Sequence, residues 1–279
     1  MKKIHIVVND EKDKELKVAG RILGFLEARN VKCSLERIRR DESQRKPYEA
    51  DIDCIITLGG DGTFIQVASG AAGSNIPMLG VNLGTTGYLT EVEKDGIEPA
   101  LERLLASDFE IENRMMLSGE FRGTEAGEKQ HYALNDVVIS RIGSLRAVSF
   151  ELIVNDRKLN TYDADGMIVA TPTGSTGYSL SAGGPIVEPT ARLIVVNPIC
   201  PHTLNTRAIV LSAEDTVRIR VLGGRSPQEY EAGVSCDGGR MAKLGVGSEV
   251  EICCAEVETR LIRLGKESFL DLLSRKLGG

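Results

Sequence analysis

Two glycine-rich turns, each placed directly after a short and mostly apolar segment, constrain the fold of this chain more than any other feature. The first turn covers residues 57–63, Thr-Leu-Gly-Gly-Asp-Gly-Thr, and follows the apolar run 54–56. The second covers residues 83–87, Leu-Gly-Thr-Thr-Gly, and follows the segment 76–82. Short apolar runs of this kind are typical of buried parallel strands, and the carboxyl ends of such strands meet at one edge of a sheet. The pattern predicts an open, mostly parallel sheet covered by helices.

The first turn carries residues that suit phosphate chemistry. Gly59, Gly60 and Gly62 have no Cβ, so the backbone can approach a polyanion closely. A carboxylate in such a turn repels phosphate, and we therefore expect Asp61 to accept a proton or to bind Mg²⁺ during phosphoryl transfer. The turn has no lysine and so does not match a Walker A loop. Taken alone, it leaves open a plain strand-to-helix connection.

Hydrophobic spacing predicts an α/β first domain over residues 1–111. We expect strands at 4–8, 31–35 and 53–58, and helices at 14–30, 63–72 and 99–105. The last helix is preceded by capping-box spacing at 95–98, and the polar segment 41–48 is expected to form a loop.

The pattern of the sequence changes near residue 111, where the alternation of predicted strands and helices ends. Short β-branched segments then recur up to residue 262, separated by Gly, Asn, Asp and Pro, which predicts a β-sandwich-like second domain. The expected strands are 116–121, 132–140, 148–154, 166–170, 193–197, 208–211, 216–221 and 249–253, with a hairpin turn at 155–158. In the tail, 263–279, residues 267–277 have helical spacing and are expected to pack back on the first domain.

Composition and charge exclude several classes of function. The chain has 279 residues and a formal net charge of −6, which argues against nucleic-acid binding. No apolar run reaches the roughly 18 residues of a membrane span, and the first apolar run ends at Asn9, too early for a signal-peptide core. We therefore expect a cytoplasmic protein without membrane contact. The six cysteines form no Cys-x-x-Cys pair and are expected to be reduced, mostly buried thiols.

A second block of chemistry-bearing residues covers 165–185. Asp165 precedes a predicted strand, and this strand leads into a run rich in Thr and Ser at 171–176. Hydroxyls both donate and accept hydrogen bonds, which suits a ligand with base, ribose and phosphate groups. Tyr178 offers a flat face for an adenine ring. An ordinary Ser- and Gly-rich loop is the alternative.

Three further features are weaker when taken singly. Asn135 and Asp136 stand at the start of an apolar strand, where an amide and a carboxylate can pair with a base edge or with ribose hydroxyls; a simple turn is the alternative. Arg146 is a candidate cation for a pyrophosphate. His202 has no nucleophile pattern near it and is expected to be structural.

Taken together, these motifs resemble the NAD kinase family. That family combines a Gly-Gly-Asp-Gly turn, an Asn-Glu pair and an Asp-Gly…Thr-Pro-Thr-Gly-Ser-Thr-Ala-Tyr-Ser-Leu-Ser-Ala-Gly-Gly-Pro block, followed by a Pro-His stretch and an Asp-Gly-Gln turn. Matching segments occur here in the same order between Gly59 and Gly239. The resemblance implies an α/β domain, a β-sandwich domain, and transfer of a phosphoryl group to the 2′-hydroxyl of the adenosine ribose of NAD, giving NADP. It also implies ATP or polyphosphate as donor, Mg²⁺ or another divalent cation, and a homodimer or homotetramer in which a neighbour completes the site.

The resemblance also assigns roles to single residues. Asp61 would activate the 2′-hydroxyl and contact Mg²⁺ together with the substrate phosphates. The donor phosphates would be lined by Gly59, Gly60, Gly62 and Thr63. NAD would be bound by Gly62, Asn135, Asp136, Arg146, Asp163, Asp165, Thr173, Thr176, Gly177, Tyr178, Ser179, Leu180 and Ser181.

Some positions depart from the family's pattern. Asp136 stands in place of Glu, Gly177 in place of Ala, Gly239 in place of Gln and Tyr88 in place of Phe. Asp163 leaves the preference between NAD and NADH open. Two other functions remain as alternatives: a lipid or sugar kinase with the same glycine turn, and a dinucleotide-binding module without catalysis.

Overall fold

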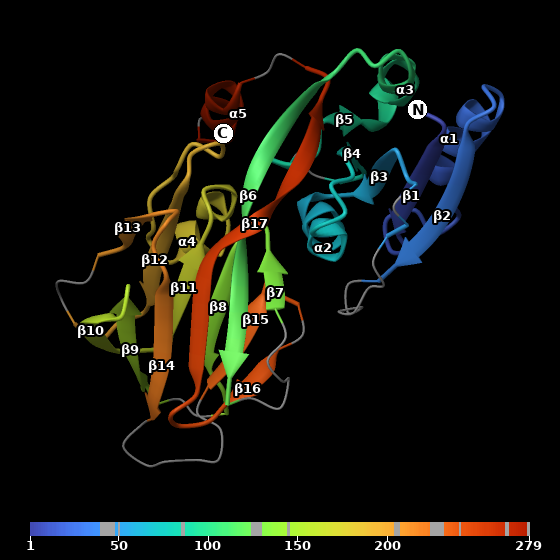
Figure 1. Ribbon diagram of the computed structural model, residues 1–279. Helices are drawn as coiled ribbons and strands as arrows, with labels where there is room; N and C mark the ends of the chain where they lie inside the picture. The colour runs from blue at the N-terminus through green and yellow to red at the C-terminus, as the bar shows by residue number, and fades with distance from the viewer. Residues whose placement is uncertain are drawn as a thin grey trace. The chain divides into compact units, whose positions relative to one another are not determined.

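The chain forms two compact units, which are described one at a time. Unit 1 comprises residues 1–114 and 258–279, and unit 2 comprises residues 115–257. The computed structural model (Figure 1) describes residues 1–39, 48–49, 51–84, 87–123, 130–143, 146–203, 207–223, 232–239, 241–265 and 268–277. The loop expected at 41–48 lies almost wholly outside the described residues, as do Thr85 and Thr86 of the second glycine-rich turn.

Unit 1 is built on a parallel sheet, as its short apolar runs predict. The strands are β1 (Lys3–Asn9), β2 (Lys32–Ile38), β3 (Cys54–Gly59), β4 (Met78–Asn82) and the short β5 (Val92–Glu93). They follow the order β2-β1-β3-β4, and every pair is parallel. β5 and the end of β17 (Glu249–Arg263) also pair with β4 in parallel. The order reverses between β1 and β3, and open α/β sheets bind ligands at such a switch point.

Helices cover both faces of this sheet. The helices α1 (Lys17–Glu27) and α3 (Ile97–Leu105) share one apolar cluster with alternate residues of β1, β3 and β4. α2 (Asp61–Ala71) packs on the other face, where the Phe64 ring lies against Gly80 of β4. The C-terminal helix α5 (Phe269–Leu277) also belongs to unit 1, so the expectation that the tail returns to the first domain is confirmed.

The helices α1, α2 and α3 each begin two or three residues away from their predicted starts. The capping box expected at 95–98 is wrong: Asp95 lies in the 3₁₀ turn η1 (Lys94–Gly96), and α3 begins directly after Gly96, which has no side chain to cap it. α1 begins later than expected because the Asp13 carboxylate accepts hydrogen bonds from the N–H groups of Val18 (3.3 Å) and Ala19 (2.8 Å). Asp13 therefore fixes the start of the helix from outside it.

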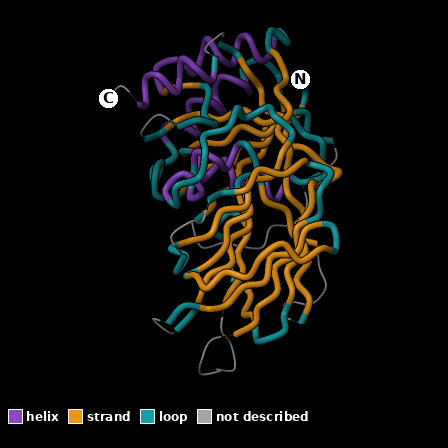
Figure 2. The backbone as a smooth tube through the Cα atoms, turned by 90° about the vertical axis from the view of Figure 1, so that its left-hand side faces the viewer, coloured by secondary structure: helices purple, strands orange, loops and turns teal. Residues whose placement is uncertain are grey.

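Unit 2 is a sandwich of two antiparallel sheets, and strands make up nearly all of its regular structure (Figure 2). The first sheet holds β6 (Glu110–Arg122), β7 (Gln130–Ala133), β9 (Val148–Val154), β10 (Arg157–Ala164), β14 (Val217–Gly223) and the start of β17. The second, in the order β13-β12-β11-β8-β15-β16, holds β8 (Asp136–Arg141), β11 (Gly166–Ala170), β12 (Leu193–Ile199), β13 (Ile209–Ser212), β15 (Ala232–Cys236) and β16 (Ala242–Leu244). Apolar side chains from both sheets form one buried cluster, which is the core of the sandwich.

The strands β6 and β17 are much longer than the sequence predicts, at 13 and 15 residues, and each passes from one unit to the other. Charged residues hide this length in the sequence. Glu112 of β6 accepts from Arg114 (2.7 Å) and from Arg263 of β17 (3.2 Å), so these charges are paired. No helix among the described residues is long and apolar enough to cross a membrane.

The close packing of the second sheet can be tested at Gly166, which pairs with both β8 and β12. A Cβ at this position would lie 2.4 Å from the Ile139 carbonyl oxygen and 3.1 Å from the Ser140 Cα. We expect Gly166→Ala to lower the free energy of unfolding by about 1–3 kcal/mol, because backbone must move to admit the methyl group. The control is Gly20→Ala in α1, where a Cβ meets nothing within 4 Å and about 0.5–1 kcal/mol is gained. Urea unfolding followed by circular dichroism measures both, and equal midpoints for the two variants contradict this packing.

Candidate active site

The two glycine-rich turns of unit 1 meet at the carboxyl edge of the sheet, as their positions predict. β3 and β4 are adjacent, with Gly59 paired to Asn82, and the N–H of Leu83 donates to the Gly59 carbonyl (2.7 Å). The Asn82 side chain is buried and holds the second turn: its Oδ1 accepts from the N–H of Gly84 (2.9 Å), and its Nδ2 donates to Glu93 (2.9 Å). Backbone and side-chain contacts therefore fix the two turns together.

The Asp61 carboxylate lies between these turns and is held by backbone donors. Its Oδ2 accepts from the N–H of Tyr88 (2.7 Å) and its Oδ1 from the N–H of Leu89 (3.0 Å). A Cβ on Gly87 would lie only 1.8 Å from Oδ1, so only glycine permits this approach. Each oxygen keeps a further lone pair, and the carboxylate can accept a proton or contact a cation while it stays oriented.

Two glycines of the first turn, Gly60 and Gly62, face open space. Asp61 is the first residue of α2 and Gly60 precedes it, and a Cβ on Gly60 or Gly62 would meet nothing within 4 Å. The first N–H groups of a helix have no partner inside the helix, so this end favours a phosphate. Gly59 has a different role, because a Cβ there would lie 2.2 Å from Thr63 Oγ1. The Thr63 side chain is buried and its hydroxyl accepts from Asn9 Nδ2 (3.1 Å), which gives Thr63 a structural part.

Lys12 is a residue at this edge that the sequence analysis missed. It follows β1, and its Nζ lies 3.5 Å from where a Cβ on Gly84 would be. Its position just beyond a strand of the same parallel sheet was the available signal. Among the described residues, no group of three or more His, Cys, Asp or Glu side chains is placed to hold a metal ion. A cation here would rest on one or two carboxylates and on substrate phosphates, which is the usual manner for Mg²⁺.

The Thr- and Ser-rich block belongs to unit 2 and is joined to the segment before β8. The Thr171 hydroxyl donates to the Leu134 carbonyl (2.6 Å), and the Thr171 N–H donates to the Asn135 carbonyl (2.8 Å). The N–H of Gly174 in turn donates to the Thr171 hydroxyl (3.0 Å). A Cβ on Gly174 would lie 2.1 Å from the Asn135 carbonyl oxygen, so this contact requires glycine.

These contacts bring together residues that are far apart in the sequence. A Cβ on Gly177 would lie 3.4 Å from Asn135 Nδ2 and 4.0 Å from Asp136 Oδ2. The Asn135 Oδ1 is buried and accepts no hydrogen bond from the described residues, which is unusual for a buried polar atom. Burial, and secondly the charge of Asp237, raise the pKa of the Asp136 carboxyl to about 7.

Asp237, in the turn after β15, holds this segment in place. Its Oδ2 accepts from the N–H of Leu134 (2.7 Å), and its Oδ1 accepts from those of Asn135 (2.8 Å) and Asp136 (3.0 Å). A carboxylate that accepts three backbone N–H groups fixes their conformation strongly. No local signal could reveal this role, because the partners lie about a hundred positions away in the sequence.

The rest of the block forms the 3₁₀ turn η2 (Thr173–Thr176) and the short helix α4 (Tyr178–Ser181). Thr173 is buried and its carbonyl accepts from the Thr176 hydroxyl (3.3 Å). Tyr178 is 47% exposed and Leu180 37% exposed, and Ser181 is also exposed, so these residues can meet a ligand. Ser179 is fully buried: its carbonyl accepts from Asn197 Nδ2 (3.0 Å), while its hydroxyl has no hydrogen-bond partner among the described residues.

Comparisons with known proteins assign this arrangement to a family. The family model of the ATP-NAD kinase N-terminal domain matches residues 39–109, and that of the C-terminal domain matches residues 134–264. A NAD kinase of Agathobacter rectalis is 41% identical over 283 residues, covering 100% of this chain and 99% of the relative. The chain belongs to the NAD kinase family. A NAD kinase of Geobacter sp. (strain M21) is likewise 41% identical over 286 residues, covering 99% of this chain and 98% of the relative.

Solved structures of the family share the fold. The crystal structure of yeast NADH kinase complexed with NADH has a TM-score of 0.86 at 22% identity and covers 100% of this chain and 88% of that one. The crystal structure of an NAD kinase from Archaeoglobus fulgidus in complex with ATP has a TM-score of 0.74 at 24% identity and covers 95% and 94% of the two chains. The α/β and β-sandwich architecture expected from the sequence is therefore confirmed.

Two departures from the family's pattern fall where this backbone leaves little room. A Cβ on Gly177 would lie 3.3 Å from the Gly174 carbonyl oxygen, and a Cβ on Gly239 would lie 3.0 Å from the Cys236 carbonyl oxygen. The Ala and Gln that the resemblance leads us to expect would be tight at these two positions unless the neighbouring backbone shifted by a few tenths of an ångström.

The remaining residues predicted to bind NAD lie away from Asn135 and Asp136, around the start of β11 and on or next to strands of the first sheet. Asp165 precedes β11 and Thr171 follows it, so about 20 Å of strand separates them. The Asp165 carboxylate accepts from Arg141 Nε (2.7 Å), and Asp163 on β10 accepts from the Ser149 hydroxyl. Arg146 is exposed just before β9. Within unit 2, the structure does not bring these residues to Asn135 and Asp136.

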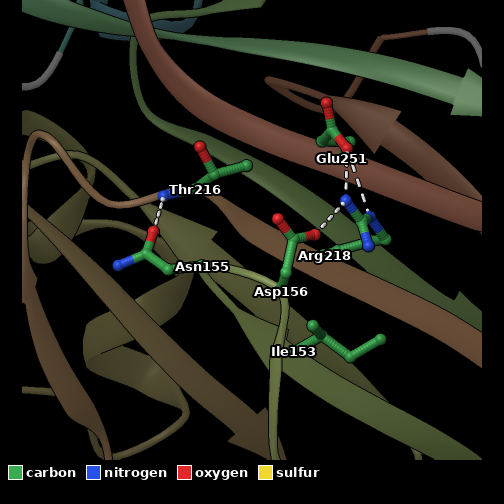
Figure 3. A pocket seen from close by; sticks show the side chains of 6 residues that line it. All are labelled: Ile153, Asn155, Asp156, Thr216, Arg218 and Glu251. Carbon is green, nitrogen blue, oxygen red and sulfur yellow. Dashed lines mark hydrogen bonds and ion pairs between the residues drawn. The ribbon is translucent and has the colours of Figure 1, made fainter.

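A pocket of about 330 Å³ in unit 2 contains none of the predicted site residues (Figure 3). Arg218 crosses it and donates to Asp156 (2.9 Å) and to Glu251 (3.0 Å), while Asn155 accepts from the N–H of Thr216 (3.0 Å). Its charged side chains satisfy one another, so the pocket presents no charge that calls for a ligand.

The raised pKa of Asp136 makes a prediction about stability. Asp136 stays neutral in the folded protein up to about pH 7, whereas in the unfolded chain it ionises above about pH 3.8. Unfolding in this window releases a proton, so the wild type loses stability relative to Asp136→Asn as the pH rises. We expect the difference to change by about 3 kcal/mol between pH 5 and pH 8. Urea unfolding at the two pH values measures it, with the exposed Glu214→Gln as control; a difference independent of pH contradicts the neutral state.

Proposed function

We propose that this protein is a NAD kinase in which Asp61 accepts the proton of the adenosine ribose 2′-hydroxyl while a phosphoryl group is transferred to it. The observation that carries the proposal is the oriented carboxylate beside the open space at Gly60 and Gly62. A sugar hydroxyl is a weak nucleophile, and a positioned base strengthens it as the bond to phosphorus forms. Membership of the family, with relatives matched along their full length, favours NAD over lipids and sugars as the acceptor.

The residues of unit 2 are proposed to bind the dinucleotide. The Asn135 Oδ1, which meets no donor among the described residues, offers an acceptor for the adenosine part of NAD. The hydroxyl of Asp136, which is neutral below about pH 7, offers a donor. The exposed Tyr178 ring would stack on the adenine. Thr173, Thr176, Gly177, Leu180 and Ser181 would complete this surface.

The donor is proposed to be ATP, with its phosphates over Gly60 and Gly62 and its charge partly balanced by Lys12. The NAD kinase from Archaeoglobus fulgidus was crystallised in complex with ATP, which supports this choice over polyphosphate. Mg²⁺ would be held by the phosphates with Asp61 as a protein partner, and it would neutralise the charge that develops on the transferred group. A cytoplasmic location remains a prediction.

Asp163, Asp165 and Arg146, which lie away from the Asn135 segment, are proposed to act on the dinucleotide of a neighbouring subunit. About 20 Å of strand separates Asp165 from the Asn135 segment, so within unit 2 these residues do not line one binding site. In a homodimer or homotetramer, Asp165 of one subunit and the Asn135 segment of another can contact the same dinucleotide. Asp163, Asp165 and Arg146 would then complete the site of the neighbour.

A single assay tests the activity. We expect NADP to form from NAD with ATP and Mg²⁺, and Asp61→Asn to lower kcat by about 10²–10⁴-fold while NAD binding is retained. Calorimetry measures the binding, and Glu110→Gln, which removes an exposed carboxylate from the same unit, is the control. Near-normal turnover by Asp61→Asn contradicts the role of Asp61. Binding of NAD without any NADP formed by the wild type would favour a non-catalytic module.

Mixing two inactive variants tests the shared site. Asp61→Asn and Asp165→Asn are each expected to be inactive, but exchange of their subunits creates mixed dimers with one intact site. Random exchange restores roughly a quarter of the wild-type sites. If Asp165 instead acts within its own subunit, mixing restores nothing, and this result contradicts the proposed arrangement.

A further inference from the structure

One face of the C-terminal helix contacts the ring of Tyr88. The Lys276 Nζ lies 4.3 Å from the centre of that ring, and the Phe269 ring lies 6.3 Å from it, centre to centre. Residues 269 and 276 are seven positions apart, which is two turns of helix, so they project from the same side of α5. The helix α5 therefore contacts the Tyr88 ring in two ways, through the cation of Lys276 and through the ring of Phe269.

The backbone of the same residue holds the Asp61 carboxylate. The N–H of Tyr88 donates to Asp61 Oδ2 (2.7 Å), and the next N–H, that of Leu89, donates to Oδ1 (3.0 Å). Burial, and secondly the charge of Asp61, raise the pKa of the Tyr88 phenol, which agrees with the closeness of ring and carboxylate. One residue thus joins α5 by its side chain to Asp61 by its backbone.

We propose that α5 positions the Asp61 carboxylate through Tyr88, so that the C-terminal helix sets the rate of phosphoryl transfer without touching a substrate. The inference rests on the proposed function of Asp61. Its physical basis is that Gly87, beside Tyr88, brings backbone so close to Asp61 that the carboxylate must follow the turn. If Phe269 and Lys276 release the ring, the turn moves and both N–H donors move with it. A displacement of about 1 Å at a reacting group can cost as much as 10²-fold in rate.

Two neighbouring residues of α5 provide a matched pair of variants. Phe269 contacts Tyr88, whereas Leu270 is 68% exposed. We expect Phe269→Ala to lower kcat about tenfold with the KM for NAD nearly unchanged, because the base is misplaced and NAD binding is not. Leu270→Ala, which removes a similar apolar area, should behave as the wild type. Lys276→Gln should lower kcat by about two- to fivefold, the value of one cation–π contact.

The role of the ring is tested at Tyr88 itself. Tyr88→Ala removes the contact with α5 and should reproduce the loss of kcat, whereas Tyr88→Phe keeps the ring and should restore most of the rate. A purely structural role of α5 would lower stability in each variant without separating kcat from KM. Lys276→Gln keeps the apolar contact and serves as the test if Phe269→Ala does not fold.

A measurement independent of catalysis completes the test. Hydrogen exchange of the Tyr88 and Leu89 amides reports directly on their bonds to Asp61. We expect faster exchange in Phe269→Ala than in Leu270→Ala, with exchange in the β1 strand unchanged. Equal exchange and equal kcat in the two variants overturn the inference, as does a loss confined to the KM for NAD. A wild type that forms no NADP refutes the proposed function instead, and the exchange data then decide alone whether α5 holds this turn.

Discussion

The two hydrogen bonds from the Tyr88 and Leu89 N–H groups to Asp61 are the interaction on which the unit 1 site depends. They join the turn after β3 to the turn after β4, and they keep the carboxylate oriented although its surroundings are otherwise open. The parallel order of the sheet makes this possible, because it delivers both turns to the same edge next to the β1–β3 switch point. This arrangement also requires glycine at position 87, because the Cβ of any other residue would overlap the Asp61 carboxylate oxygen.

Unit 2 uses the same device at its own site. Asp237 accepts three consecutive backbone N–H groups and so fixes the segment that presents Asn135 and Asp136. In both units a carboxylate orders a loop and adds negative charge near residues that are proposed to bind an anionic substrate. The formal net charge of the chain is also negative, at −6. In unit 1, the groups proposed to offset the charge of Asp61 and of the phosphates are the N-terminus of α2, Lys12 and a divalent cation bound with the phosphates.

The sequence predicted those parts of the structure that depend on local chemistry. The glycine turns at strand ends, the parallel sheet and the hairpin at Asn155 all follow from short stretches of residues. The lengths of β6 and β17 could not be predicted, because Glu112 and Arg263 look like solvated surface charges in the sequence. In the structure they form an ion pair between the two strands. The role of Asp237 was hidden for a similar reason, since its partners lie in a distant segment. The predicted capping box at 95–98 is absent because Asp95 and Gly96 belong to a 3₁₀ turn.

Two carboxyl groups lie close together in unit 2, those of Asp136 and Asp237. Asp136 is buried beside Asp237. Two ionised carboxylates would repel one another strongly there, because surroundings of low polarity screen charge weakly. Asp237 accepts three backbone N–H groups, and it is the pKa of Asp136 that is raised, by burial first and by the charge of Asp237 second. A neutral carboxyl has an O–H to donate as well as an oxygen to accept, and it can therefore recognise a ribose hydroxyl or a ring nitrogen without adding charge to the site. The Asp136 Oδ2 lies 4.0 Å from where a Cβ on Gly177 would be, so the carboxyl group is next to the Thr- and Ser-rich block.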